Sequence, residues 1–331
     1  MNQEVKIAVF GGGSWATAIV KMLCENVAKV GWYMRNTTAI DYINEHNHNP
    51  NYLTSVEFKT TQLFLSDDIN EMVAYADVII FAIPSAFVSS ELSKLNVSLS
   101  NKTFFSAIKG IVPETGLIVG EHLHETYKIP FENIGVITGP CHAEEVAMER
   151  LSYLTIACQD EEKAKNLSAL LTSDYIFCKN SDDIIGAEYA AMLKNIYAIA
   201  AGIAHGLGYG DNYQAVLMSN AIREMKRYIK KIHKMKRNIN HSAYLGDLLV
   251  TGYSTFSRNR MFGNMIGKGY TVKSAMMEMK MVAEGYYALK SAYEINQKNE
   301  VKTPIIDAVY QIVYEGKSPK KYFKILSEQL N

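Results

Sequence analysis

The feature that most constrains the fold is a glycine-rich turn between a β-like run and a helix-like one. Val5–Phe10 is apolar and largely β-branched, and it leads directly into Gly11. Gly11, Gly13 and Ala16 match the spacing G-x-G-x-x-(G/A), and a helical pattern, TAIVKML, follows. The first glycine allows a tight turn, the second lets the backbone approach a pyrophosphate, and the third small residue keeps the helix close to the sheet. A flexible linker does not fit because strand and helix patterns flank the turn, so the segment predicts a dinucleotide-binding βα unit.

The end of the next predicted strand bears on the choice of dinucleotide. Val30–Met34 has strand character, and Arg35 follows it. A site selective for NAD usually carries Asp or Glu at this place, where it binds the ribose 2′-hydroxyl. A guanidinium instead suits a 2′-phosphate, while a solvated surface arginine is the alternative. Arg35 therefore predicts that NADP(H) is accepted.

The order of predicted elements divides the chain into two domains. Short β-rich runs alternate with helical stretches up to about Ser181, which is typical of a doubly wound, mostly parallel sheet. Beyond that residue the helical pattern prevails, in the ranges Ala187–His205, Tyr213–Lys236, Val272–Met281, Glu284–Asn296, Pro304–Tyr314 and Pro319–Gln329. We predict a Rossmann-type α/β domain over residues 1–185 and an all-helical domain over 186–331.

Composition excludes several classes of function. The 34 Lys and Arg residues balance the 34 Asp and Glu residues, which gives no bias toward nucleic acid or an anionic membrane. Four scattered cysteines form no CxxC pair and predict neither a zinc motif nor a disulfide framework. No apolar run is long enough to span a bilayer, and the first twenty residues have a strand–turn–helix pattern rather than that of a signal peptide. A cytoplasmic protein is expected.

Lys194 is the strongest candidate for proton transfer. The predicted helix around it is almost entirely apolar apart from Glu188, Lys194 and Asn195. A lysine on a small, apolar helix surface is expected to be desolvated, which lowers its pKa and eases proton transfer near neutral pH. The alternative is a side chain that extends to solvent.

Other candidates lie at strand ends and in two later polar segments. Lys109 follows a predicted strand, where ligands of doubly wound sheets bind, although an exposed lysine is the alternative. The segment from Thr138 to Glu144 also joins a strand to a helix, and its Cys141 is better interpreted as a structural or contact residue than as a nucleophile. Asp247 belongs to a GDL segment, and Arg258 with Asn259 offers donors for a phosphate or carboxylate, with helix capping as the alternative.

Taken together, the motifs resemble the NAD(P)-dependent glycerol-3-phosphate dehydrogenases of bacterial type. The matching segments, in order, are GGGSWATA, SAIKG, GPCHAEEVA, EYAAMLKNIYAIAAGI, GDLLVT, SRNRMFG, VAEGY and TPI. The resemblance implies a Rossmann domain followed by a helical domain like the C-terminal domain of 6-phosphogluconate dehydrogenase. It also implies reversible reduction of dihydroxyacetone phosphate to sn-glycerol 3-phosphate, a phospholipid precursor, by a homodimer.

The resemblance assigns roles residue by residue. It makes Lys194 the proton donor or acceptor at the substrate oxygen. The implied substrate contacts are Lys109, Gly139, Cys141, Lys194, Asp247, Ser257, Arg258 and Asn259. The implied NAD(P)H contacts are Gly11, Gly13, Ser14, Trp15, Ala16, Arg35, Lys109, Ala143, Arg258, Val282 and Glu284.

The chain departs from the family pattern at Cys141, where Ser or Thr is frequent, which puts a hydroxyl contact to substrate in doubt. Ala16 replaces a frequent glycine, a change that the fingerprint tolerates. Two rival functions remain: a dehydrogenase of β-hydroxy acids on the same two-domain plan, and a non-catalytic NAD(P)H sensor. The GDL and SRN segments favour a phosphorylated triose over the first rival, and Lys109, Lys194 and Asp247 argue against the second.

Two further features have alternative interpretations. The basic helix over 223–237 carries an apolar stripe at Met225, Ile229 and Ile232, which could dock on anionic lipid but is better explained by packing inside the helical domain. Two histidine pairs, at 46/48 and 122/124, have no Cys or carboxylate spacing that would complete a metal site, and no metal is predicted.

Overall fold

The computed structural model describes residues 5–279 and 283–331, which form two compact units. One unit contains the chain up to Ile108 together with Leu117–Ile184, and the other contains Lys109–Gly116 together with Ile185–Asn331. The short segment Lys109–Gly116 therefore leaves the α/β part of the sequence and packs with the helical part. A single domain boundary near residue 185 does not describe this segment. Because of the segment, Lys109 belongs to the helical unit.

The α/β unit is built on a twisted sheet of eight strands among the described residues. In chain order they are β1 (Ile7–Phe10), β2 (Val30–Tyr33), β3 (Leu63–Ser66), β4 (Val78–Phe81), β5 (Thr103–Ser106), β8 (Ile134–Thr138), β9 (Ser152–Cys158) and β10 (Ile176–Ser181). Their spatial order is β10-β9-β8-β5-β4-β1-β2-β3, and only the β8–β9 pair is antiparallel. The predicted doubly wound, mostly parallel sheet is confirmed.

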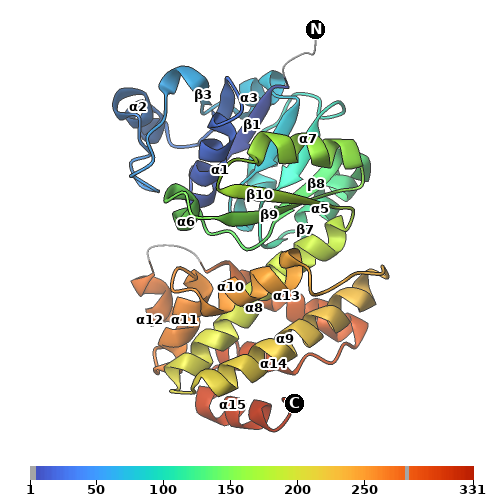
Figure 1. Cartoon of the computed structure of the whole chain (residues 1–331). Helices are drawn as coiled ribbons and strands as arrows, with labels where there is room; N and C mark the ends of the chain where they lie inside the picture. Colours follow the sequence, from blue (N-terminus) through green and yellow to red (C-terminus); the bar gives the residue numbers. More distant parts are fainter. Residues whose placement is uncertain (1–4, 280–282) are drawn as a thin grey trace. The chain divides into compact units, whose positions relative to one another are not determined.

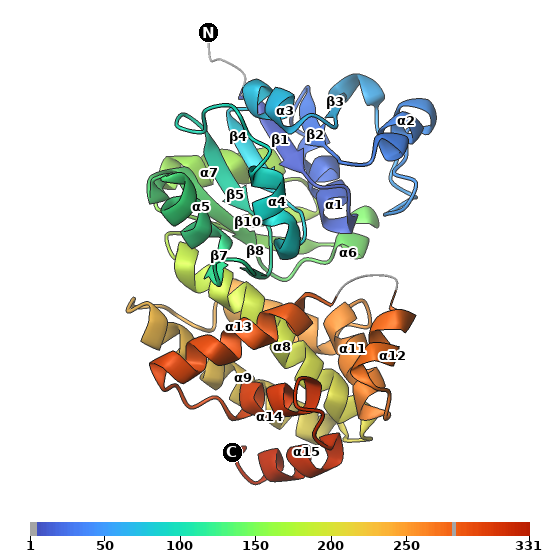
Figure 2. The same cartoon turned by 180° about the vertical axis from the view of Figure 1, so that it is seen from behind.

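Apolar residues pack both faces of this sheet against helices. The helices are α1 (Ser14–Cys24), α2 (Thr37–His46), α3 (Ile69–Tyr75), α4 (Val88–Leu92), α5 (Val119–Tyr127), α6 (Ala143–Ala147) and α7 (Glu161–Leu171), and a short strand β7 (Leu117–Ile118) precedes α5. Figure 1 shows α1 and α7 in front of the sheet, and Figure 2 shows α4 and α5 on the opposite face. Fully buried side chains such as Val9, Ile80 and Trp32 lie on adjacent strands in register, since Val9 is opposite both of the others. Parallel strands covered on both faces bring the ends of β1, β2, β4, β5 and β8 to one edge.

The second unit is helical. Its elements are β6 (Ile111–Val112), α8 (Ile184–Gly206), α9 (Asp211–Ile232), a π-helical turn (Ser242–Gly246), α10 (Asp247–Tyr253), α11 (Arg258–Gly267), α12 (Val272–Glu278), α13 (Glu284–Asn299), α14 (Pro304–Val313) and α15 (Pro319–Ser327). The middle of α8 is buried all round, as Leu193, Ile196 and Ile199 show by their complete loss of solvent exposure. Helices α11 and α13 approach α8 closely, since a Cβ on Gly202 of α8 would lie 2.0 Å from the Arg260 carbonyl oxygen and one on Gly285 of α13 would lie 2.7 Å from that of Asn195. Within the described residues, no helix is both long and apolar enough to cross a bilayer.

The apolar stripe of the basic segment 223–237 packs inside this unit. Met225 and Ile229 of α9 are fully buried, while Ile232 is half-buried at the end of the helix. Lys230 and Lys231, in the last turn, are exposed. The packing interpretation therefore accounts for the stripe, and the charges face water.

The buried carboxyl group of Glu224 ties α9 to α14. Glu224 has no exposed surface, and its two oxygens accept hydrogen bonds from the backbone N–H groups of Ile305 (2.9 Å) and Ile306 (3.0 Å). These are orphan donors of the first turn of α14, whose N-cap residue Thr303 makes no side-chain cap bond. Burial raises the pKa of Glu224 from 4.5 to about 8, although the two N–H groups act in the opposite direction.

This arrangement predicts a pH-dependent stability. Because the folded state holds the proton of Glu224 more tightly than the unfolded chain does, the group stabilises the fold below pH 4.5, and that contribution is lost as the pH rises through about 8. In wild type the free energy of unfolding should fall as the pH rises from 4.5 to about 8, and in Glu224→Gln this fall should be smaller. Chemical denaturation at a series of pH values measures it, and equal slopes for both proteins would contradict the assignment.

Candidate functional site

The glycine-rich turn has the geometry that its spacing predicts. Gly11 has φ +134°, and a Cβ at this position would lie 2.5 Å from the carbonyl oxygen of Ala82, at the end of β4. Any L side chain at this position is both strained and blocked. Gly13 is the N-cap of α1, and a Cβ there would enter open space. Gly11 is thus required by the chain's own packing, whereas Gly13 borders a space that a ligand can use.

The carbonyl oxygens of Gly11, Gly12 and Gly13 all accept hydrogen bonds from side chains of the protein. The Trp32 indole donates to the Gly11 oxygen (2.6 Å), Asn49 Nδ2 donates to the Gly12 oxygen (3.1 Å), and Thr17 Oγ1 donates to the Gly13 oxygen (3.0 Å). These bonds fix the backbone of the turn before any ligand binds. Sequence reasoning missed Trp32 and Asn49, and only their positions in the fold reveal them.

The start of α1 fits a dinucleotide pyrophosphate. Gly13 gives the helix no side-chain cap, so its first turn keeps backbone N–H donors for an anion. Ser14 and Ala16 are buried in this first turn, and Trp15 is partly buried against the core of the unit. The helix, its dipole and the open space at Gly13 together make the residues present compatible with NAD(P)H.

Arg35 lies at the end of β2 with its side chain about half exposed. Its guanidinium is 4.4 Å from the centre of the Phe87 ring, and Nη1 is 3.4 Å from an oxygen of the buried Glu91. Arg35 is therefore a surface side chain, as the alternative expects, and it also contacts a ring and a buried carboxylate. Sequence reasoning missed both partners.

The end of β8 supplies a second turn at the same edge of the sheet. Gly139 has φ +119°, and a Cβ there would lie 2.7 Å from the carbonyl oxygen of Tyr153. Cys141 is 3% exposed, and α6 begins at Ala143 and packs against α1. The segment Gly139–Ala143 is therefore part of the same α/β unit as the glycine turn.

In the helical unit, the structure brings together three predicted site residues that are far apart in the sequence. Lys194 of α8 and Asp247 at the start of α10 form a hydrogen-bonded ion pair through Nζ and Oδ1, and their side chains are only 3% and 2% exposed. Lys109 lies beside them, in the segment that has joined this unit. The burial of Lys194 excludes the solvent-exposed alternative.

The charges around Lys194 tune its proton affinity. Burial lowers the pKa of Lys194 to about 7, with the Lys109 charge acting in the same direction and Asp247 opposing both. A lysine in this state is divided between its charged and neutral forms near neutral pH. The group can therefore both donate and accept a proton.

Asn195 and Asn259 hold the surrounding backbone in place. Asn195 Nδ2 donates to the carbonyl oxygen of Lys109 (3.1 Å), and Asn259 Oδ1 accepts from the N–H of Gly285 (2.9 Å). A Cβ on Gly285 would lie 2.7 Å from the Asn195 carbonyl oxygen, so α13 approaches α8 closely here. Lys109, Lys194 and Asn259 thus belong to one connected group of elements.

The remaining predicted residues lie around the starts of α11 and α13. Ser257 is the N-cap of α11, its Oγ accepting from the N–H of Arg260 (3.3 Å), and Arg258 is the first helical residue. The cap is thus supplied by Ser257 and not by Arg258 or Asn259, for which capping was the alternative, and Arg258 lies at a helix N-terminus. Glu284 opens α13, and Val282 lies outside the described residues.

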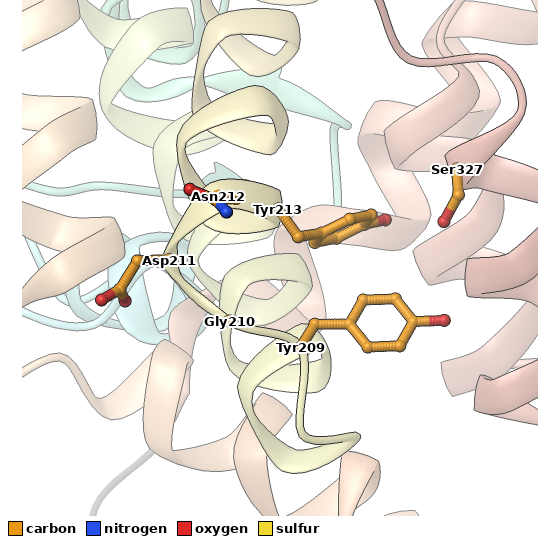
Figure 3. Close-up of a pocket in the computed structure, with 6 residues that line it drawn as sticks. All are labelled: Tyr209, Gly210, Asp211, Asn212, Tyr213 and Ser327. Atoms are coloured by element: carbon orange, nitrogen blue, oxygen red, sulfur yellow. The ribbon is translucent and has the colours of Figure 1, made fainter.

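The helical unit also has a surface hollow of about 650 Å³ that contains none of the predicted site residues. Its lining residues are Tyr209, Gly210, Asp211, Asn212, Tyr213 and Ser327 (Figure 3). It is formed by the α8–α9 turn and the end of α15, whereas Lys194 lies in the middle of α8. In the described part of the chain, no group of three His, Cys, Asp or Glu side chains could hold a metal ion.

Comparisons with known proteins identify the family. The model described as "NAD-dependent glycerol-3-phosphate dehydrogenase N-terminus" matches residues 6–164, and the corresponding C-terminal model matches residues 183–324. Glycerol-3-phosphate dehydrogenases (NAD(P)+) of Staphylococcus epidermidis and Staphylococcus aureus are 34% and 35% identical, each over 326 residues and 98% of both chains. The crystal structure of glycerol-3-phosphate dehydrogenase from Coxiella burnetii superposes with a TM-score of 0.90 at 28% identity, over 98% of this chain and 99% of that one.

The glycine turn, the two-unit fold and these full-length matches all point to the same family. The chain belongs to the NAD-dependent glycerol-3-phosphate dehydrogenase family and is an NAD(P)-dependent oxidoreductase.

Proposed function

We propose that this enzyme reversibly reduces dihydroxyacetone phosphate to sn-glycerol 3-phosphate, with Lys194 as the proton donor and acceptor. The observation that supports this most strongly is the buried group formed by Lys194, Asp247 and Lys109. A buried lysine whose pKa is near 7, paired with a carboxylate and next to a second cation, suits proton transfer to a developing alkoxide.

Bound NAD(P)H supplies a hydride from C4 of its nicotinamide. As the ketone carbon accepts it, the C–O π pair moves onto the oxygen, which takes a proton from the Lys194 ammonium and becomes the hydroxyl. The Lys109 charge stabilises the developing negative oxygen. Neutral Lys194 then regains a proton from solvent, and Asp247 holds its side chain in position.

The substrate phosphate needs donors, and the start of α11 has them. Arg258 can form a paired contact to phosphate oxygens, Asn259 keeps its Nδ2 donor while its oxygen is bonded to Gly285, and Ser257 keeps its hydroxyl proton. A helix N-terminus adds a favourable dipole. We assign the backbone at Gly139 and Cys141 to the rest of the substrate, in line with the family resemblance.

The pH dependence of the reaction follows from the Lys194 pKa. Reduction requires the ammonium form, so kcat/KM for ketone reduction should fall as the pH rises through about 7. Oxidation of glycerol 3-phosphate requires the neutral form, so its kcat/KM should rise through the same range. Lys109→Met removes a neighbouring positive charge and should move both inflections to higher pH. Profiles that keep the same inflection in the variant would contradict this account of the site.

The choice of substrate is tested with matched compounds. Dihydroxyacetone phosphate should be reduced efficiently, and dihydroxyacetone, which lacks only the phosphate, should be a poor substrate. The semialdehyde of a β-hydroxy acid tests the rival dehydrogenase. Preference for that semialdehyde would overturn the proposed substrate while leaving the family assignment intact.

We also propose the cellular setting that the family resemblance implies. The product is a precursor of glycerophospholipids, the enzyme works in the cytoplasm, and it forms a homodimer. Sedimentation of the purified chain tests the dimer, and loss of phospholipid synthesis in a deletion strain, restored by glycerol 3-phosphate, tests the cellular role.

A further inference from the structure

A second charged group lies in the α/β unit, where Arg35 after β2 meets Glu91 of α4 (these two elements are labelled in Figure 2). It is centred on Glu91, whose side chain is 2% exposed. Oε2 of Glu91 accepts from the Tyr33 hydroxyl at 2.5 Å, while Oε1 lies 2.8 Å from Lys94 Nζ and 3.4 Å from Arg35 Nη1. We call Tyr33, Arg35, Glu91 and Lys94 the Glu91 cluster.

The Glu91 cluster holds two cations side by side around one anion. Burial alone would raise the pKa of Glu91, but hydrogen bonds from Lys94 and Tyr33 outweigh it and keep the pKa below its ordinary value. The carboxylate is therefore charged, and the cluster has one positive charge in excess. Asp67, the other carboxylate that influences Tyr33, is exposed and screened by water.

The two cations are accessible to a ligand. The side chains of Arg35 and Lys94 are 48% and 50% exposed, although their charged atoms meet at the same oxygen of Glu91. Phe87, itself 39% exposed, supports the flat face of the Arg35 guanidinium at 4.4 Å. Two half-exposed cations that share one carboxylate oxygen can both donate hydrogen bonds to the oxygens of a phosphate monoester.

We propose that Lys94 is a second cation of the site that recognises the adenosine 2′-phosphate of NADPH, and that Glu91 is the positioning residue that holds Arg35 and Lys94 together. The end of β2 is where a doubly wound dinucleotide site meets the ribose 2′-position. Arg35 alone offers one cation there, whereas Arg35 and Lys94 together offer two positive charges to the dianionic 2′-phosphate. This inference concerns selection between cofactors and does not depend on the proposed substrate.

Binding of two nucleotides that differ only in the 2′-phosphate tests the role of Lys94. Isothermal titration calorimetry of the full chain with 2′,5′-ADP and with 5′-AMP gives the affinity ratio without turnover. Lys94→Met should weaken 2′,5′-ADP binding by about tenfold, the effect of losing one charged hydrogen bond, and should change 5′-AMP binding by less than about twofold. Lys94→Arg should restore most of the ratio. Equal weakening of both nucleotides, or of neither, would overturn the assignment.

A matched control is available on α7. Lys165 is 49% exposed and pairs with two glutamates at helical spacing, much as Lys94 pairs with Glu91. Lys165→Met should leave the ratio unchanged, because it removes the same charge from the same unit at a site with no assigned ligand. A similar loss in both variants would indicate a general effect of net charge and contradict a specific subsite.

Glu91→Gln separates positioning from electrostatics. The variant makes the cluster more positive, so a purely electrostatic role of Glu91 predicts tighter binding of 2′,5′-ADP. The positioning role predicts the opposite, a ratio of 2′,5′-ADP to 5′-AMP affinity that falls by about threefold or more as Arg35 and Lys94 lose their common anchor. A rise in the ratio would overturn the role assigned to Glu91.

Discussion

Lys194→Ala is expected to lower kcat for dihydroxyacetone phosphate reduction by at least about 100-fold, the lower end of the effect of removing a general acid. The side chain is 3% exposed, so water does not readily replace it as the proton donor. Its loss also leaves the Asp247 carboxylate buried without its cation. Steady-state measurement of reduced-nicotinamide oxidation at saturating substrate gives the size of the effect.

Two controls separate this effect from misfolding. Lys226→Ala removes an exposed lysine from α9 of the same unit and should leave kcat unchanged. The affinity of the Lys194 variant for 2′,5′-ADP should match that of the wild type, because the Glu91 cluster and the glycine turn belong to the other unit. A Lys194→Ala enzyme that keeps a third or more of the wild-type kcat would rule out proton transfer by this residue.

Gly202→Val is expected to destabilise the helical unit by roughly 3 kcal/mol or more, because it forces apart two helices whose backbones touch. A Cβ at Gly202 of α8 would lie 2.0 Å from the carbonyl oxygen of Arg260, and one at Gly263 of α11 would lie 2.1 Å from that of Ile199. Gly206 and Gly267 meet in the same way one turn further on. Both helices therefore use a glycine every four residues to pack closely.

Activity should fall together with stability in this variant. The contact sets the position of α11, which carries Arg258 and Asn259, relative to α8, which carries Lys194. Gly210→Ala is the matched control, since a Cβ there meets nothing and the backbone is not left-handed. Chemical denaturation followed by circular dichroism measures the difference, and similar unfolding curves for the two variants would show that the helix contact is not tight.

Much of the α/β unit could be predicted from local patterns. The run Val5–Phe10 and the glycines after it predict β1, the turn and α1. Apolar, β-branched residues favour a strand, and the glycine spacing favours a tight turn before a helix, so short-range sequence is enough. The strand β3 (Leu63–Ser66) was not predicted, since the segment before it lacks a regular pattern and the strand has only four residues. The helix α11 was also missed, because Arg258, Asn259 and Arg260 give its first turn a polar appearance.

The candidate site could be predicted as a set of residues but not as an arrangement. Lys194 stands out because a charge is unusual on an apolar helix, yet nothing local indicates that Asp247, 53 positions later, is its partner. Lys109 belongs to the helical unit because the short segment Lys109–Gly116 packs there, and local sequence does not reveal this tertiary packing. The Glu91–Lys94 spacing of three residues is a helical pair visible in the sequence, but its link to Arg35 appears only when β2 and α4 are placed together.

The most direct test of the proposed reaction follows the transferred hydrogen. The purified enzyme is incubated with dihydroxyacetone phosphate and with NADPH carrying deuterium in one or the other stereochemical position at C4, and the product is examined by NMR. We predict that one of the two cofactors yields sn-glycerol 3-phosphate deuterated at C2, one equivalent for each cofactor oxidised, and that Lys194→Ala forms it at least about 100-fold more slowly. Failure of both cofactors to give C2-deuterated glycerol 3-phosphate would contradict the reaction assigned to this site.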